Sequence, residues 1–153
     1  MVRDSISLVP IADSEQHEFL EAAEAYFREL NPAFVAQEDW KNHYVAQLRS
    51  GQDIYMRWIE SRGQCAGFVI FGLEKHRFLP RTSGCVYELY VFPRFRRLGV
   101  GETAAKEVIR LLREFSPSKI QLEIALGNTS GVAFWRSLGF KKISERYVLK
   151  EGQ

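Results

Sequence analysis

The sequence predicts an α/β (α+β) domain in which strand-like and helix-like segments alternate along one chain. Stretches such as 54–60 and 65–71 are rich in β-branched and aromatic residues, which is typical of strands. Segments 14–30, 37–50 and 100–112 instead carry apolar residues at helical spacing. Hydrophobic residues make up 46% of the 153 residues, which suits a packed core. We therefore expect a single domain over residues 1–153.

Proline and glycine mark most of the expected boundaries. Pro10 and Pro93 cannot donate to a sheet ladder, so each ends a strand. Asn31-Pro32 ends the first helix, and Gly51 ends the second. In chain order we expect a strand at 5–10, helices at 14–30 and 37–50, strands at 54–60, 65–71 and 86–93, a helix at 100–112, a strand at 119–125, a helix at 128–138, and a final hairpin of 140–144 and 146–150.

The turn between Pro93 and the helix that begins near Val100 has the composition of an anion site. Residues 94–101 hold two glycines and three arginines. The first amides of a helix lack intrahelical partners, and the helix dipole adds positive charge there. Glycine lets an anion approach the backbone closely. The turn therefore predicts a phosphate or pyrophosphate site, although a tight turn with solvated arginines is the simpler alternative. Neither a P-loop nor a dinucleotide fingerprint is present.

The same residues resemble the acyl-CoA signature of the GNAT superfamily of N-acyltransferases, Arg/Gln-x-x-Gly-x-Gly/Ala. The preceding segment, 88–93, is similar to that family's fourth strand, and the order of elements agrees. The resemblance implies a GNAT fold with a mixed, mostly antiparallel sheet of six to seven strands and about four helices. It also implies acetyl-CoA (coenzyme A) as cosubstrate and no metal.

The resemblance further implies how the cofactor is held. Backbone amides of the turn would bind the pyrophosphate, and the backbone of the central strand would pair with the pantetheine arm. The turn residues are Arg96, Arg97, Leu98, Gly99, Val100 and Gly101, and the strand residues are Leu89, Tyr90 and Val91.

A second motif departs from the family pattern at one position. Asn128 matches the start of that later motif, but Trp135 occupies the place of its tyrosine. In the family this tyrosine commonly protonates the leaving thiolate, which an indole N–H cannot do. A thiolate is a good leaving group, so activity can survive the change. We favour a packing role for Trp135 beside the cofactor, and leave Tyr87, Tyr90 and Tyr147 as candidate acids.

Glu88 is the best candidate for a general base. An amine must lose a proton before it can attack a thioester, and Glu88 is a charged residue in an otherwise apolar strand beside the expected thioester site. Several family members carry an acid at this place. The alternative is a strand-end glutamate that faces solvent. His76 is the second candidate, and the amide of Leu89 or Val91 would polarise the thioester oxygen.

These residues predict an N-acetyltransferase that transfers acetyl from acetyl-CoA to a primary amine by direct attack. The alternative, which Trp135 leaves open, is a non-catalytic acyl-CoA-binding sensor or interaction module. The first two helices are acidic and loop 74–83 is basic, so an acceptor with an amine and a carboxylate, or a peptide N-terminus, would suit them. Equally, both regions could be solvated surface.

Composition and charge also bear on partners, location and metal binding. The net charge of +2 argues against nucleic-acid binding. The chain has no apolar run of about 18 residues and no apolar signal core, so we expect no membrane span and a cytoplasmic location. The three histidines are scattered, which predicts no metal site. A homodimer is the candidate assembly.

Overall fold

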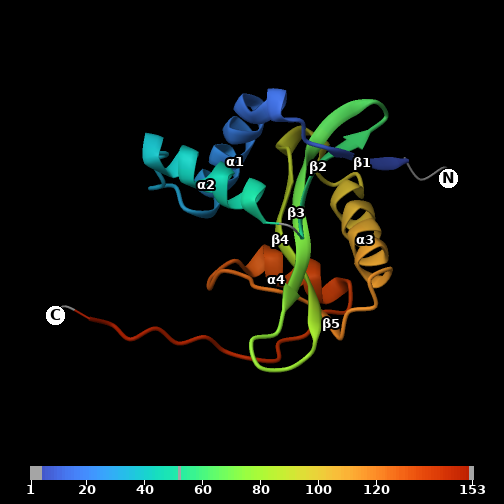
Figure 1. Ribbon diagram of the computed structural model, residues 1–153. Coiled ribbons are helices and arrows are strands. Elements are labelled where there is room, and N and C mark those ends of the chain that lie inside the picture. Colours follow the sequence, from blue (N-terminus) through green and yellow to red (C-terminus); the bar gives the residue numbers. More distant parts are fainter. Residues whose placement is uncertain (1–4, 52, 152–153) are drawn as a thin grey trace. The chain divides into compact units, whose positions relative to one another are not determined.

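The computed structural model describes residues 5–51 and 53–151 (Figure 1). The chain divides into two compact units, Met1–Glu123 and Ile124–Gln153, which are described separately below. The first unit contains the sheet and three of the helices, and the second contains one helix and a C-terminal segment.

The first unit is built on a five-stranded sheet with the order β1-β2-β3-β4-β5. Neighbouring strands from β1 to β4 are antiparallel, whereas β5 is parallel to β4. A parallel neighbour requires a crossover connection, and the helix α3 (Val100–Arg113) supplies it. The strands are β1 (Ile6–Pro10), β2 (Ile54–Ser61), β3 (Gln64–Lys75), β4 (Thr82–Val91) and β5 (Lys119–Leu122).

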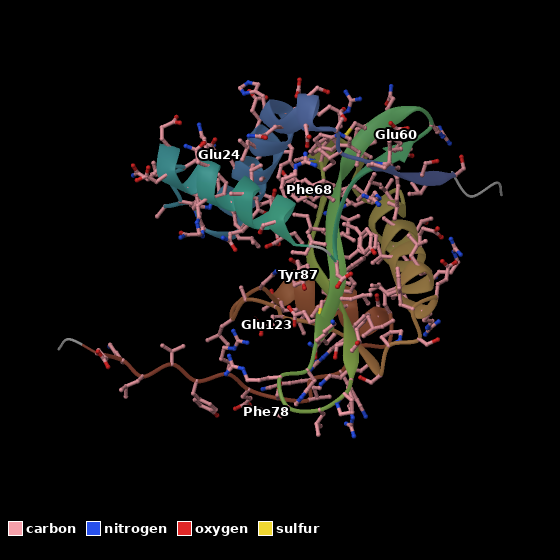
Figure 2. The ribbon with its side chains drawn as sticks, in the orientation of Figure 1. Glu24, Glu60, Phe68, Phe78, Tyr87 and Glu123 are labelled. Atoms are coloured by element: carbon pink, nitrogen blue, oxygen red, sulfur yellow. The ribbon has the colours of Figure 1, made fainter. Side chains whose placement is uncertain are left out.

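Helices cover both faces of this sheet. The helices α1 (Gln16–Leu30) and α2 (Glu38–Ser50) lie on one face, and α3 lies on the other (Figure 1). Short 3₁₀ turns, η1 (Asp13–Glu15) and η2 (Pro93–Phe95), precede α1 and α3. On the first face, Phe19 of α1 is fully buried against Phe68 of β3, with ring centroids 5.3 Å apart (Figure 2). Burial of a side chain of this size stabilises the fold by roughly 1.5–3 kcal/mol.

The opposite face is held by the apolar stripe of α3. Ala104, Val108 and Leu112 are fully buried. Gly84 of β4 leaves room for Leu112, because a Cβ added at Gly84 would lie 3.3 Å from the Leu112 side chain. The spacing of apolar residues in this helix was therefore a reliable guide to which side it buries.

Strand β4 contains a β-bulge next to the site described below. Ile70 of β3 pairs with Glu88, and the next residue, Phe71, pairs with Val86, so Tyr87 is the extra residue on β4. The β4–β5 pairing ends at the same place, where Val86 meets Leu122. Beyond this point no strand in the described part of the chain pairs with the outer edge of β4.

The second unit contains the helix α4 (Thr129–Ser137) and the extended segment that follows it. The expected hairpin of residues 140–144 and 146–150 is wrong, and the described sheet has five strands instead of six to seven. A hairpin needs a cross-strand ladder and a buried face. Here Ile143, Val148 and Leu149 are at least 67% exposed, and no backbone hydrogen bond pairs the two expected strands.

Candidate active site

The turn between β4 and α3 presents a row of free backbone donors. The amides of residues 97–101 have no backbone acceptor in the part of the chain that the structure describes. The first helical bond is donated by the amide of Thr103 to the carbonyl of Gly99, at 3.0 Å. Gly99 is the N-cap residue and has no side chain to satisfy these donors. Five consecutive N–H groups are thus available at the positive end of the α3 dipole.

The backbone of this turn has a conformation suited to an anion. Gly99 has φ of 81°, and Arg97 has φ of 63°, which is uncommon for a residue with a Cβ atom. A left-handed residue followed by a right-handed helical one, as at Gly99 and Val100, points successive amides into one concavity, an arrangement that binds phosphate groups. A Cβ added at Gly99 would meet nothing within 4 Å, so the space above the turn is open. The residues present therefore fit a pyrophosphate.

Arg96 differs from the expectation for this turn. Its amide donates to the carbonyl of Pro93 at 3.2 Å, so it is not one of the free donors. Its side chain donates from Nε to the carbonyl of Val91 at 3.0 Å and from Nη2 to Oε2 of Glu29 at 2.8 Å. The carbonyl of Val91 is consequently occupied as well. The Val91 carbonyl and the Glu29 carboxylate are both engaged, because the planar guanidinium of Arg96 can bind a carbonyl and a carboxylate at the same time.

The outer edge of β4 lies open beside this turn. Leu89 and Tyr90 pair with Val69 and Phe68 of β3 on the inner side. On the outer side the pairing with β5 stops at Val86, as described above. An unpaired edge offers N–H and C=O groups to any extended chain with amide groups of its own. The pantetheine arm of coenzyme A has such groups.

Glu88 lies on the face covered by α1 and α2, because it pairs with Ile70 of the core on that face. Its carboxyl is partly buried, and burial raises the pKa of Glu88 from 4.5 to about 7. A hydrogen bond from the hydroxyl of Tyr26 acts in the opposite direction and lowers that pKa. A carboxyl that titrates near neutrality can accept a proton efficiently at physiological pH. This behaviour is typical of a general base.

Two tyrosines of the helical face approach this carboxylate. Tyr26 of α1 packs against Tyr90, with ring centroids 5.4 Å apart. Tyr44 of α2 stacks on Trp40 at 5.1 Å. The pKa of Tyr26 and that of Tyr44 are both raised, first by burial and then by the charge of Glu88.

The hydroxyl of Tyr44 is buried and has no hydrogen-bond partner among the described residues. An unsatisfied buried hydroxyl costs about 1–3 kcal/mol, so a polar ligand that bonded to it would gain from the contact. Neither Tyr26 nor Tyr44 was among the residues predicted for the site. A tyrosine on an apolar helix face is a signal for a polar contact, but it does not reveal the partner.

The three tyrosines considered as acids are already engaged. Tyr87 donates to Oε1 of Glu74 at 2.9 Å (Figure 2), and Tyr90 donates to Oε2 of Glu29 at 3.3 Å. Burial, followed by the hydrogen bond to Glu74, raises the pKa of Tyr87, and burial, followed by the charge of Glu29, raises the pKa of Tyr90. Tyr147 belongs to the second unit and donates to Glu145. A raised pKa makes a phenol a weaker acid, so Tyr87 and Tyr90 are poorly suited to protonate a thiolate.

His76 shapes the loop between β3 and β4. Its Nδ1 accepts hydrogen bonds from the amides of Phe78 and Leu79, at 3.1 and 3.0 Å. Its own amide donates to the carbonyl of Arg81 at 2.8 Å. The imidazole is thus used to close an exposed loop, which favours a structural role over that of a base.

Asn128 and Trp135 lie in the second unit. The side chain of Asn128 caps α4 by accepting from the amide of Gly131 at 3.0 Å. The indole of Trp135 packs against Phe134 and Phe140, with centroids 4.9 and 5.3 Å away. Both residues therefore have local structural roles within this unit.

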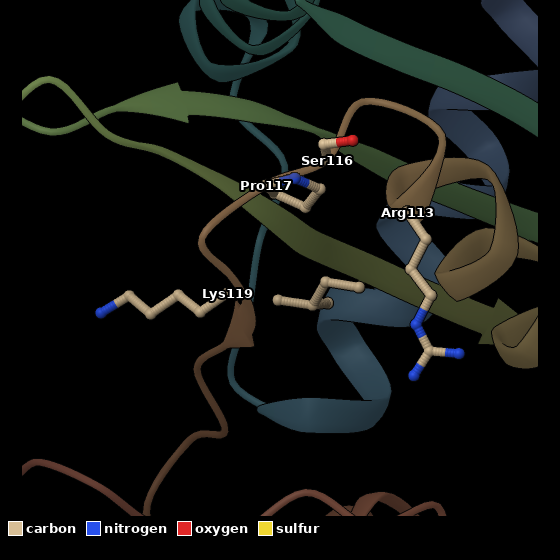
Figure 3. A pocket seen from close by; sticks show the side chains of 5 residues that line it. Arg113, Ser116, Pro117 and Lys119 are labelled. Carbon is tan, nitrogen blue, oxygen red and sulfur yellow. The ribbon is translucent and has the colours of Figure 1, made fainter.

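Other features of the described residues add no reactive group. A shallow pocket of about 320 Å³ lies where α3 ends and β5 begins, lined by Arg113, Ser116, Pro117, Lys119 and Ile120 (Figure 3). Within residues 5–51 and 53–151, no group of three or more histidine, cysteine, aspartate or glutamate side chains is placed to hold a metal ion. In the same residues, no helix has the length and apolar character needed to cross a membrane.

The chain was compared with models of known protein families. The model of the acetyltransferase (GNAT) family matches residues 12–140. The chain therefore belongs to the GNAT family of acetyltransferases. The predicted fold class is confirmed, apart from the number of strands.

Two archaeal proteins are similar in sequence. An uncharacterized N-acetyltransferase of Methanocaldococcus jannaschii is 23% identical over 146 residues, which cover 92% of this chain and 61% of that protein. An N-alpha-acetyltransferase of Sulfurisphaera tokodaii is 24% identical over 102 residues, which cover 61% of each chain. This chain thus spans about three fifths of the length of these relatives.

Solved structures show the same fold at low sequence identity. A ribosomal-protein-alanine N-acetyltransferase from Brucella melitensis has a TM-score of 0.73 and 20% identity, over 96% of this chain and 99% of that one. An aminoglycoside 6′-N-acetyltransferase from Acinetobacter haemolyticus has a TM-score of 0.72 and 18% identity, over 97% and 99%. A third, AAC(6′)-Iy, is in complex with a coenzyme A bisubstrate analogue. Its TM-score is 0.70 at 15% identity, over 99% of both chains.

Proposed function

We propose that this chain is an N-acetyltransferase that transfers the acetyl group of acetyl-CoA to a primary amine of a small molecule or peptide by direct attack. The main supporting observation is the run of free amides at residues 97–101, at the start of α3 and next to the open edge of β4. The coenzyme A analogue bound to a structural neighbour supports the same cofactor. The alternative proposal is given below.

In this proposal the turn and the open edge bind the cofactor. The amides of residues 97–101, the α3 dipole and the exposed Arg97 hold the pyrophosphate. The backbone of Leu89 and Tyr90 pairs with the pantetheine arm. Asn128 and Trp135 are assigned to the cofactor by the family resemblance. When bound, acetyl-CoA supplies an acyl group activated as a thioester.

Glu88 acts as the base in this proposal. It accepts the proton of the ammonium, directly or through a water, and Tyr26 keeps the carboxylate oriented by its hydrogen bond. The amine nitrogen then forms a bond to the acyl carbon while the carbon–sulfur bond breaks. The second proton of the nitrogen passes to the departing thiolate, directly or through water, which gives the N-acetyl product and free coenzyme A. In this proposal the amide of Leu89 or Val91 polarises the thioester oxygen. Because a thiolate is a good leaving group, the reaction does not depend on a tyrosine acid.

The acceptor is proposed to be a primary amine that lies against α1 and α2. Neighbouring structures are named for acetylation of aminoglycosides and of ribosomal-protein alanine, which are both amine acceptors. The buried hydroxyl of Tyr44 provides a hydrogen-bonding group on that face. We further propose that residues 1–153 act as one domain, located in the cytoplasm, with a homodimer as the candidate assembly.

The second candidate is a non-catalytic acyl-CoA-binding sensor or interaction module. Trp135 favours it, because an indole replaces the family's usual acid. In this case the turn would bind acyl-CoA as above, but no acceptor would be acetylated.

One experiment tests the cofactor and the reaction separately. Isothermal titration calorimetry with coenzyme A should show saturable binding, with ATP at equal concentration as a control for unspecific anion binding. Release of free thiol from acetyl-CoA is then measured with polyamines, aminoglycosides and alanine-initiated peptides. Binding with turnover supports the enzyme, and binding without turnover supports the module. Absence of coenzyme A binding at millimolar concentration would contradict both.

A further inference from the structure

A polar network, which we call the Glu29–Arg96 strap, joins the last turn of α1 to the turn between β4 and α3. That turn, residues 96–101, is called the cofactor turn below. Arg96 donates to Glu29 at 2.8 Å and to the carbonyl of Val91 at 3.0 Å. Its guanidinium also lies over the ring of Tyr90, 5.5 Å from the centroid, and the Tyr90 hydroxyl donates to the same oxygen of Glu29 at 3.3 Å. The strap thus connects α1, the end of β4 and the first residue of the turn.

Three donors of Arg96, namely Nε, Nη2 and the backbone amide, already have hydrogen-bond partners within the chain. Its Nε and Nη2 point to Val91 and Glu29, and its amide donates to Pro93. The hydrogen bond to Glu29 raises the pKa of Arg96, so the guanidinium is fixed in its charged form. Arg97, the next residue, is exposed and remains the arginine available to a phosphate.

The other end of the strap lies close to the base. Tyr26 precedes Glu29 by three residues on α1, which places both on neighbouring turns of one helix face. The ring of Tyr26 packs on Tyr90, and its hydroxyl bonds to Glu88. Movement of the last turn of α1 would therefore move Tyr26 relative to the carboxylate that it orients.

A solvent-exposed ion pair by itself would carry little weight. The side chains of Arg96 and Glu29 are 39% and 47% exposed, and isolated pairs of this kind contribute little to stability. The strap differs because the guanidinium has three partners and the carboxylate accepts two donors. Several contacts that form together fix both side chains with less additional loss of entropy than one pair would.

We propose that Arg96 is a positioning residue and that the Glu29–Arg96 strap transmits order from the occupied cofactor turn to the last turn of α1. Ligand bound to the amides of residues 97–101 immobilises the turn, and the strap then restrains α1 and with it Tyr26. The inference rests on the proposed function in one respect, namely that the turn binds coenzyme A.

Hydrogen–deuterium exchange tests the strap without an acceptor. Exchange is measured with and without saturating coenzyme A in the wild type, in Glu29→Gln and in Glu24→Gln. Glu24 is the matched control, because it pairs with Arg28 inside α1 and does not reach the turn. In the wild type and in Glu24→Gln, coenzyme A should slow exchange at residues 26–31 by about two- to fivefold, the range expected for a small network of exposed charges.

Glu29→Gln should lose this response while its affinity for coenzyme A stays within about threefold of the wild type. Retention of the response in Glu29→Gln, or its absence in a wild type that binds coenzyme A, would overturn the strap. If coenzyme A does not bind, the proposed function fails, and the strap is then tested in the protein without ligand. Exchange at residues 92–97 should then be faster in Glu29→Gln and unchanged in Glu24→Gln, and equal rates in both variants would overturn it.

Discussion

At the scale of single residues, the site depends on a carboxyl held in aromatic surroundings. Glu88 is charged in water but is placed by the β4 bulge on the face that packs under α1 and α2. Desolvation disfavours its anion, and the hydroxyl of Tyr26 restores part of the lost solvation. The balance leaves its pKa at about 7, where a carboxylate is both substantially ionised and basic enough to take a proton from an ammonium.

The first prediction concerns the pH dependence of turnover. Because the ionised form of Glu88 is the proposed base, kcat/KM should rise with pH and reach half of its plateau at about pH 7. Glu88→Gln should lower kcat by about 10²-fold or more while coenzyme A affinity changes little. The measurement is thiol release over pH 5.5–9 with the best acceptor of the panel, a range set to bracket a pKa of about 7.

Glu74→Gln is the control for this prediction, since Glu74 bonds to the adjacent Tyr87 from an exposed position. It should keep the wild-type profile. An unchanged profile in Glu88→Gln would remove Glu88 from the mechanism.

At the scale of elements, the strand, turn and helix at 82–113 form the functional unit. Strand β3 pairs with β4 on one side, the pairing with β5 on the other side ends at Val86, and the packed stripe of α3 fixes the direction of the helix dipole. The proposed anion site consists almost entirely of main-chain groups, and its side-chain charge would come from Arg97, which the strap does not occupy. Positive φ at Arg97 and Gly99 aims these amides outward.

The second prediction separates the arginines of this turn. Arg97→Gln should weaken coenzyme A binding by about three- to tenfold, because it removes a charge beside the pyrophosphate. Arg94→Gln is the matched control, since Arg94 stacks on Phe95 at 4.6 Å and donates to Gln64. Calorimetric titration of both variants checks the difference. Equal affinity in the two variants would show that Arg97 does not contact the cofactor.

At the scale of the whole molecule, burial of the ionised Glu88 carboxylate lowers the stability of the fold. A buried carboxyl with a raised pKa binds its proton more tightly in the folded chain than in the unfolded chain. This contribution to stability is therefore present below about pH 4.5 and is lost as the pH rises through about 7. Above that pH, the fold retains the full penalty of a partly buried anion.

The third prediction follows from this sign. Glu88→Gln should raise the free energy of unfolding at pH 8 by roughly 1–3 kcal/mol and change it little at pH 4.5. Urea denaturation at the two pH values measures the difference. If Glu88→Gln were destabilised equally at the two pH values, the contacts of Glu88 would contribute more to stability than its burial removes.

Most of the fold could be predicted from the sequence because it is local. Pro10 and the helical spacing of α3 gave a correct strand end and a correct buried face, since these depend on neighbouring residues. The end predicted at Pro93 was two residues late, because β4 ends at Val91 and Pro93 begins η2. The strands β3 and β4 are longer than expected, because the ladder between Glu74, Lys75 and their partners extends pairing into polar residues. The hairpin of residues 140–150 was wrong for the converse reason, as alternation without a ladder partner does not form a strand.

The site could be predicted only in part. The turn at 97–101 and Glu88 could be proposed from the sequence, because residue types and their spacing indicate a phosphate-binding turn and a charged residue in an apolar strand. Glu29 is 67 residues from Arg96, and Tyr26 and Tyr44 come to Glu88 from separate helices. No spacing in the chain signals these contacts, so the engagement of Arg96 and the groups that face the base were missed.

The sequence by itself indicated the family and the order of the elements as far as α4, and it predicted an anion site in the turn before α3, because each of these depends on interactions between residues a few positions apart. Only the tertiary structure decided which groups of that turn remain free, which tyrosines face Glu88, and how far its pKa is raised. These properties depend on burial and on contacts between distant segments, and both arise only when the helices pack against the sheet.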